Sequence, residues 1–216
     1  MKNNVYLFSG LGADERVFAH LKFPKSNVRH IKWPAVTRET STEVFLSKIK
    51  DQIKTKQDNV FLGVSFGGLI AQDMAAFLPV KTLIILSSVT TPAEMPRLYK
   101  SVIARLMLKI TPNFVLRKPN TFIDYMFSIK TNEGRNTLRD VIRDTDPAFL
   151  RWAIAYLQKW QKPKENRAKT VHRLHGSNDR IFPIIPFGAG TQIVSGGHFA
   201  VYETANEINR CLKSWL

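Results

Sequence analysis

The sequence predicts an α/β domain in which a mostly parallel sheet of about six strands is flanked by helices. Two observations lead to this expectation. Short apolar runs alternate with amphipathic stretches near both ends of the chain, and a long helical stretch without strand alternation separates the two parts. With 216 residues, of which 44% are hydrophobic and 23% charged, the chain is long enough for one domain with a sizeable core.

The first part of the chain contains four expected strands and two expected helices. The strands are predicted at residues 5–9, 27–33, 59–64 and 80–86. Thr40 and Glu43 have the spacing of a capping box, and apolar residues then recur at four-residue steps, which indicates an amphipathic helix. The alanine-rich stretch 66–78 ends before Pro79 and indicates a second helix. The almost continuous apolar run at 80–86 is typical of a strand covered on both faces.

The order of strands and helices resumes near the C-terminus. Strands are expected at residues 170–175 and 191–195, and a terminal helix at 199–215. We therefore assign residues 1–89 and 170–216 to the core and residues 90–169 to a helical insertion.

Helical signals fill this insertion. One expected helix has an apolar face formed by Leu98, Tyr99, Val102, Ile103, Leu106 and Ile110. Its opposite face carries Arg97, Lys100, Arg105 and Lys109. Asp146 and Pro147 indicate the start of another helix. The apolar face of that helix is formed by Phe149, Leu150, Ala153, Ile154, Leu157 and Trp160.

The chain is strongly basic, with 32 Lys or Arg against 17 Asp or Glu and a formal net charge of +15. Residues 91–173 contain 17 of the basic and 7 of the acidic residues, so a net +10 lies in this one segment. No nucleic-acid-binding motif accompanies the charge, and we therefore expect no nucleic-acid partner. The charge is interpreted as a solvated surface, or as one that attracts an anionic substrate, an acyl carrier or a phospholipid surface.

Several classes of protein are disfavoured by the sequence. No apolar run approaches the roughly 18 to 20 residues of a membrane-spanning helix. The apolar stretch near the N-terminus covers only residues 5–8, which is short for a signal peptide, so we expect a cytoplasmic protein. Cys211 is the single cysteine, which excludes an intramolecular disulfide and a cysteine-rich zinc site.

Residues 63–68 read Gly-Val-Ser-Phe-Gly-Gly and lie between an expected strand and the following helix. This is Gly-x-Ser-x-Gly in the strand–turn–helix context of a nucleophile elbow. Such a sharp turn strains the serine backbone, so the residues two positions away must lack side chains. The helix N-terminus also favours the negative charge that develops in acyl transfer. We interpret Ser65 as a nucleophile; the alternative is a glycine-rich turn that contains the pattern by chance.

A serine hydroxyl needs a neighbouring base, and the base needs a carboxylate to orient it. His198 follows the last expected strand and two glycines, so its loop can approach Ser65 closely. His175 is interpreted as a residue packed at a strand end. Asp179 lies in the loop after the preceding strand, although an aspartate there is also typical of a turn. The stretch after residues 80–86 offers no acid before Glu94, which favours Asp179.

An oxyanion requires two N–H donors close to the serine. The first candidate is the backbone N–H of Phe66, directly after Ser65. The second lies in the Ser-Gly-Leu-Gly turn at residues 9–12, where Leu11 is preferred over Gly12. Gly-x-Gly after a strand is also found in nucleotide-binding turns, but Glu15 stands where that fingerprint requires a third glycine.

Residues 8–12, 63–68, 175–179 and 196–199 together resemble the α/β-hydrolase superfamily, in the order of its motifs and across the whole chain. The resemblance implies esterase, lipase or thioesterase chemistry through an acyl-enzyme, without a cofactor or metal. It implies that His198 is the base and that residues 90–169 are a lid. Ser9 stands where many members have histidine. The first two strands of the family are missing, which predicts the reduced sheet.

We therefore expect a carboxylesterase-like hydrolase of a small or acyl-chain substrate. Ser65 attacks the acyl carbon, His198 transfers the proton, Asp179 orients His198, and the N–H groups of Phe66 and Leu11 bind the oxyanion. Two alternatives stay open: a binding protein of this fold without turnover, and a thioesterase acting on an anionic carrier-linked substrate. The oligomeric state does not follow from the sequence.

Overall fold

The computed structural model describes residues 2–54, 59–101, 110–183 and 190–216. Six strands form one sheet in the order β2-β1-β3-β4-β5-β6, and every neighbouring pair runs parallel. The strands are β1 Asn3–Phe8, β2 Ser26–His30, β3 Asn59–Val64, β4 Val80–Leu86, β5 Ala168–Gly176 and β6 Thr191–Val194. The predicted mostly parallel sheet of about six strands is confirmed.

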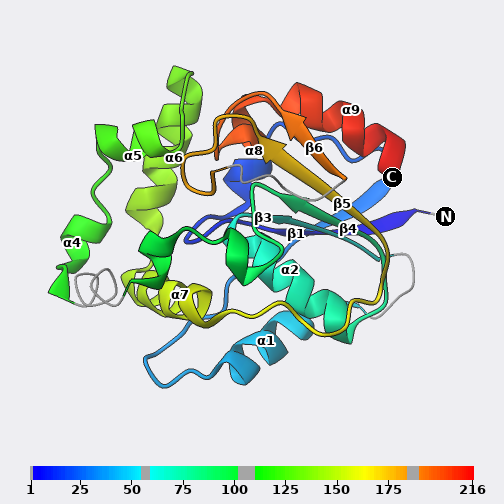
Figure 1. Ribbon diagram of the computed structural model, residues 1–216, viewed down its shortest axis with the longest axis horizontal. Coiled ribbons are helices and arrows are strands. Elements are labelled where there is room, and N and C mark those ends of the chain that lie inside the picture. The colour runs from blue at the N-terminus through cyan, green and yellow to red at the C-terminus, as the bar shows by residue number, and fades with distance from the viewer. Residues whose placement is uncertain (1, 55–58, 102–109, 184–189) are drawn as a thin grey trace.

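Helices cover both faces of the sheet (Figure 1). On β1, Tyr6 and Phe8 pack in one core cluster, while Val5 and Leu7 pack in the other. The Tyr6 face is covered by α1 (Thr42–Lys50), α2 (Phe66–Phe77) and α7 (Pro147–Lys159). The Val5 face is covered by η1 (Glu15–Phe18), α8 (Ala200–Glu203) and α9 (Ala205–Trp215). This is the coverage that a purely parallel sheet requires.

Two predicted helix boundaries differ from the structure. Ser41, not Thr40, caps α1: the Ser41 hydroxyl accepts from the N–H of Val44, while the Thr40 hydroxyl accepts from the N–H of Thr37. The helix predicted at 199–215 is divided at Thr204 into α8 and α9. The Thr204 side chain donates to the carbonyl of Ser195, a contact outside the helix.

Every regular element described between β4 and β5 is helical, and loops connect these elements. This segment contains η2 (Pro92–Glu94), η3 (Arg97–Lys100), α4 (Asn113–Leu116), α5 (Thr121–Met126), α6 (Asn132–Asp144) and α7. Asp146 caps α7 as predicted, accepting from the N–H of Ala148 at 2.8 Å. Half of the apolar face predicted between Leu98 and Ile110 falls in residues 102–109, outside the described residues. Ile110 itself is exposed.

This helical segment lies at the carboxyl ends of the strands (Figure 1). Thr145 donates to the carbonyl of Gly12 in the loop after β1, and Ser128 donates to the carbonyl of Asn178 in the loop after β5. The helices therefore cover the edge of the sheet where the predicted site residues lie. No helix of the described residues is long and apolar enough to cross a membrane.

A buried carboxyl group joins α7 to α2. Asp73 of α2 accepts hydrogen bonds from the hydroxyl of Tyr156 and from Nε1 of Trp160. Burial raises the pKa of Asp73 to about 7, although the two hydrogen bonds act in the opposite direction. Both donors are neutral, so the ionised carboxylate is poorly compensated at this junction.

Asp73→Asn is expected to make stability less dependent on pH. The pKa of Asp73 is about 7 in the fold against an ordinary 3.8, so the folded protein binds this proton more tightly than the unfolded chain. This difference in pKa contributes up to about 4 kcal/mol to the free energy of unfolding. The contribution is fully present below about pH 4 and is lost as the pH rises through about 7. Asparagine does not titrate. Urea unfolding of both proteins across this range measures the effect, and equal pH slopes would contradict the raised pKa.

Candidate active site

Ser65 occupies the sharp turn between β3 and α2. Its backbone has φ 54° and ψ −121°, which is strained for a residue with a side chain. A methyl group on Gly67 would overlap the carbonyl oxygens of Phe8 and Ser9, and one on Gly63 would overlap the backbone of Gly67. The start of α2 therefore lies directly against β1, and only glycine permits this approach.

His198 and Asp179 form a hydrogen-bonded chain with Ser65. Nε2 of His198 lies 2.8 Å from Oγ of Ser65, and Nδ1 lies 2.8 Å from Oδ2 of Asp179. A carboxylate can only accept, so Nδ1 carries the proton. In the neutral ring, Nε2 is then free to accept the proton of the Ser65 hydroxyl. The three residues come from the turn after β3, the loop after β5 and the loop before α8.

The carboxyl group of Asp179 is fully enclosed. Its Oδ1 accepts from the N–H groups of Ile181 and Phe182, at 2.9 and 2.8 Å. Burial raises the pKa of Asp179, but the charge of His198 and the hydrogen bonds from His175, His198 and Phe182 outweigh it. The net result is a pKa well below the usual range. Asp179 is therefore ionised and can stabilise a protonated His198.

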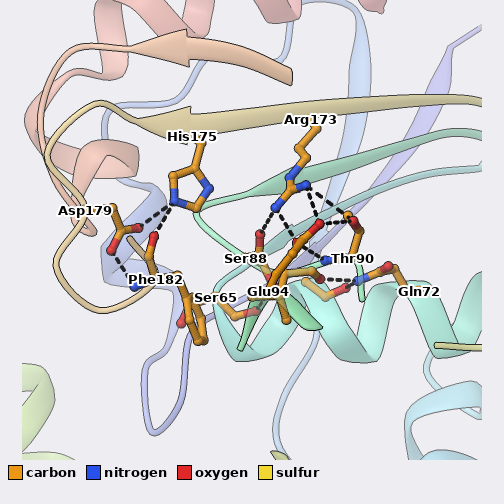
Figure 2. A network of polar contacts seen from close by, with 11 residues as sticks. Ser65, Gln72, Ser88, Thr90, Glu94, Arg173, His175, Asp179 and Phe182 are labelled. Atoms are coloured by element: carbon orange, nitrogen blue, oxygen red, sulfur yellow. Dashed lines mark hydrogen bonds and ion pairs between the residues drawn. The ribbon is translucent and has the colours of Figure 1, made fainter. Parts of the chain in front are cut away.

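His175 is a second histidine on the same carboxylate. Its side chain is completely buried at the end of β5, and Nε2 lies 2.7 Å from the carbonyl of Phe182 and 3.3 Å from Oδ2 of Asp179 (Figure 2). Because a carbonyl only accepts, Nε2 is the donor in this contact. The prediction of a residue packed at a strand end was incomplete, because His175 also fixes the loop that carries Asp179.

The turn after β1 lies beside Ser65. The carbonyl of Gly10 accepts from the N–H of Ala13 at 3.0 Å and from Nε1 of Trp33 at 3.3 Å. In a trans peptide the following N–H, that of Leu11, points in the opposite direction. Ser9 closes the turn by donating from Oγ to the carbonyl of Ala13 at 2.7 Å.

Phe66 is the first residue of α2. The first N–H groups of a helix have no intrahelical acceptor. Both predicted oxyanion donors, the N–H groups of Leu11 and Phe66, thus belong to residues that line the same cavity as Ser65.

This cavity has a volume of about 230 Å³ and reaches both Ser65 and His198. Helices α6 and α7 form much of its wall through Leu138, Val141, Ile142, Ile154 and Leu157. No Lys, Arg, Asp or Glu is present among the described residues that line it. Nor does the described part of the chain group three His, Cys, Asp or Glu side chains in an arrangement that could hold a metal ion.

A partly buried ion pair connects the backbone of Ser65 to the segment after β4 (Figure 2). Oγ of Ser88 donates to the carbonyl of Ser65 at 2.6 Å, and Arg173 of β5 donates to the carbonyl of Ser88 at 3.1 Å. The same guanidinium binds Glu94 at 2.6 Å, and Glu94 accepts from the N–H of Thr90. Sequence reasoning missed this network, because Arg173 gave only the signal of a strand residue.

No family model matches this chain, and no curated protein matches it by sequence. Solved structures do match. A thermophilic esterase from Thermogutta terrifontis is 16% identical, with a TM-score of 0.70 and coverage of 100% of this chain and 89% of the other. An enol-lactonase from Burkholderia xenovorans is 15% identical, with a TM-score of 0.73 and coverage of 100% and 91%. A bromoperoxidase from Bacillus anthracis is 15% identical, with a TM-score of 0.70 and coverage of 100% and 92%.

This chain has the α/β-hydrolase fold. The three proteins carry different names on one architecture, so the activity of this α/β-hydrolase-fold protein must be argued from its own site. Within that fold, the structure brings Ser65, His198 and Asp179 together at one cavity, with Leu11 and Phe66 in its wall.

Gly67→Ala is expected to destabilise the protein by about 1–3 kcal/mol, because its methyl group has no space against β1. This loss acts against the better helix propensity of alanine, about 1 kcal/mol. Gly10→Ala is the matched control: the nearest atom to its methyl group is Cβ of Ser65 at 3.8 Å, an ordinary contact. Thermal unfolding compares the two variants. Equal losses would contradict the close approach of α2 to β1.

Proposed function

We propose that this protein is a serine hydrolase of carboxylic esters. The observation that carries the proposal is the chain from Asp179 through His198 to Ser65, with both contacts at 2.8 Å and a cavity beside the serine. Nucleophile, base and orienting carboxylate are the groups that acyl transfer needs. The fold shared with an esterase and an enol-lactonase agrees with this chemistry.

In the proposed reaction, Oγ of Ser65 attacks the ester carbonyl carbon while Nε2 of His198 accepts the hydroxyl proton. The N–H groups of Leu11 and Phe66 stabilise the oxyanion of the tetrahedral intermediate. The intermediate then expels the alcohol, which takes the proton from His198, and the acyl group remains on Ser65. Asp179 stays ionised throughout and stabilises the imidazolium, in agreement with its lowered pKa.

Water completes the cycle. His198 removes a proton from a water molecule, which attacks the acyl carbon, and the second tetrahedral intermediate collapses to release the acid and the Ser65 hydroxyl. The same steps apply to a thioester, because only the leaving group differs. The proton that Ser65 recovers comes from His198, so the enzyme ends in its starting state.

The size and lining of the cavity favour a substrate with a small and uncharged acyl group. Its volume of about 230 Å³ lies below the roughly 300–1,000 Å³ of pockets for drug-sized ligands. The wall from α6 and α7 is apolar. We propose that residues 90–169 act as a lid on a core of residues 1–89 and 170–216, since this segment supplies the wall opposite Ser65.

Ser65→Ala is expected to abolish labelling by a fluorophosphonate probe and to lower kcat by about a million-fold. Asp179→Asn is expected to lower kcat by about ten-thousand-fold, because asparagine favours the wrong tautomer of His198. Initial rates on a short p-nitrophenyl ester and on an acyl thioester measure both effects.

Ser47→Ala, on the exposed side of α1, is the matched control and should label as wild type does. Full labelling of Ser65→Ala would overturn the assignment of the nucleophile. A correctly folded wild-type protein that is neither labelled nor active on any of these substrates would favour the alternative of a binding protein.

The size of the cavity predicts a preference for short acyl chains. Forcing extra methylene groups into a filled apolar site costs about 1–3 kcal/mol, so long-chain p-nitrophenyl esters should react about ten- to a hundred-fold more slowly in kcat/KM than short ones. Leu157→Ala removes side-chain volume from the wall, which enlarges the cavity, and should shift the preference to longer acyl chains. Leu46→Ala, outside the cavity, should leave it unchanged. A wild-type preference for long chains would contradict the proposed substrate class.

A further inference from the structure

Large apolar side chains are exposed in one short stretch of the helical segment. Among the described residues, half of the exposed large apolar side chains lie between residues 110 and 125. They are Ile110 (66% exposed), Phe114 (73%), Val115 (43%), Phe122 (67%) and Tyr125 (58%). Such a concentration is unusual for a surface that faces only water, where single exposed apolar residues are the rule.

Arginine side chains attach this stretch to the rest of the protein. Arg151 of α7 donates to the carbonyl of Thr111 at 2.6 Å and to Oδ1 of Asn113 at 2.8 Å. Arg139 of α6 binds the buried Asp124 of α5 at 2.6 Å. Because these polar contacts hold α4 and α5, the phenylalanines remain outside the core. Both helices lie at the outer edge of the helical layer, away from the sheet (Figure 1).

Helix α6 presents two different faces. Leu138, Val141 and Ile142 line the cavity at Ser65. Its arginines at positions 135, 139 and 143 recur at four-residue steps, so they form one stripe on the helix surface. The stripe adjoins α5 through the ion pair of Arg139 with Asp124, and Nε of Arg117 at the end of α4 donates to the backbone carbonyl of Arg143.

Two shallow concavities on this side are lined by cations. The first, of about 700 Å³, is formed by Phe114 together with Arg117, Lys118, Arg139 and Arg143, and no acidic residue is among the described residues that line it. The second, of about 520 Å³, shares Arg139 and Thr121 with the first. It adds Lys130, Arg135 and Arg180. Among the described residues that line it, the one acidic residue is Asp124, which is buried and paired with Arg139.

We propose that this surface, residues 110–125 with the arginine stripe of α6, binds an anionic phospholipid bilayer. Lys and Arg near a bilayer are attracted by its negative surface, and Phe and Tyr insert at the boundary of headgroups and acyl chains. Charge complementarity selects an anionic partner. The protruding phenylalanines favour a bilayer over an acidic protein, because a bilayer accepts apolar side chains without a matching pocket.

The arrangement also gives the bound protein an orientation. The cavity wall and the cationic stripe occupy adjacent sides of α6, about 100° apart around the helix axis. Binding through the stripe therefore places α6 at the bilayer, with the face that lines the cavity turned about 100° away from the lipid surface. Binding of the bilayer by this surface does not depend on whether the protein hydrolyses esters.

Binding is tested by co-sedimentation of the full chain with vesicles of phosphatidylcholine alone or mixed with phosphatidylglycerol. Wild type should bind only the mixed vesicles. The double variant Lys118→Gln/Arg143→Gln should bind about thirty-fold more weakly, from about five-fold per charge. Lys48→Gln/Lys50→Gln, an equal change of charge on exposed positions of α1, is the matched control and should bind as wild type.

Insertion is tested separately with tryptophan in place of phenylalanine. The fluorescence difference spectrum of Phe122→Trp should shift to the blue with mixed vesicles. That of Phe77→Trp, an exposed position at the end of α2, should not. Hydrolysis of a soluble short ester should be unchanged in the two double charge variants.

Three results would overturn the proposal. Equal weakening of both double variants would show that only the overall charge of the chain acts. The absence of a blue shift for Phe122→Trp would exclude insertion. Binding of an acidic acyl carrier protein in place of vesicles would assign the surface to a protein partner.

Discussion

The approach of α2 to β1 at the turn of Ser65 is the constraint on which the site depends. Glycine at positions 63 and 67 allows the backbones to touch, and the turn can then hold Ser65 at a positive φ. Such strain costs of order 1–3 kcal/mol and persists only where the surroundings fix it. Here β3 is buried along its whole length and most of α2 is buried as well. Burial of β3 and α2 in the core therefore offsets the backbone strain of the turn.

Two of the polar junctions between the helical segment and the core differ in character. At one, Arg173 and Glu94 form a partly buried ion pair behind Ser65. Burial raises the pKa of Glu94, but the hydrogen bonds from Arg173 and Thr90 and the charge of Arg173 outweigh it, so the net pKa is lowered. At the other, Asp73 meets only the neutral donors Tyr156 and Trp160 and titrates near neutral pH. A change of pH near neutrality therefore alters the charge of Asp73, where α7 contacts α2. It leaves the ion pair of Arg173 and Glu94 unchanged.

The local signals of the sequence predict most of the fold. Apolar runs bounded by glycine or proline located the strands, and the glycines around Ser65 located the elbow, because each signal lies within a few residues. The cap of α1 was assigned one residue too early, since Thr40 and Ser41 carry equivalent hydroxyl groups. The support of Asp179 by His175 and of Gly10 by Trp33 could not be predicted, because these contacts depend on loops folding toward one another and follow no fixed spacing.

The two faces of α6 restrict which changes of sequence this helix can accept. Each residue of an α-helix is rotated by about 100° from the previous one. A single inserted or deleted residue within Asn132–Asp144 would therefore turn every later side chain by that angle. A deletion before Val141 would turn Val141 out of the cavity wall and give Arg143 the orientation that Ile142 now has, whereas an insertion there would turn Ile142 to the orientation that Arg143 now has. A substitution changes one face of this helix, whereas a change of its length disturbs both faces at once.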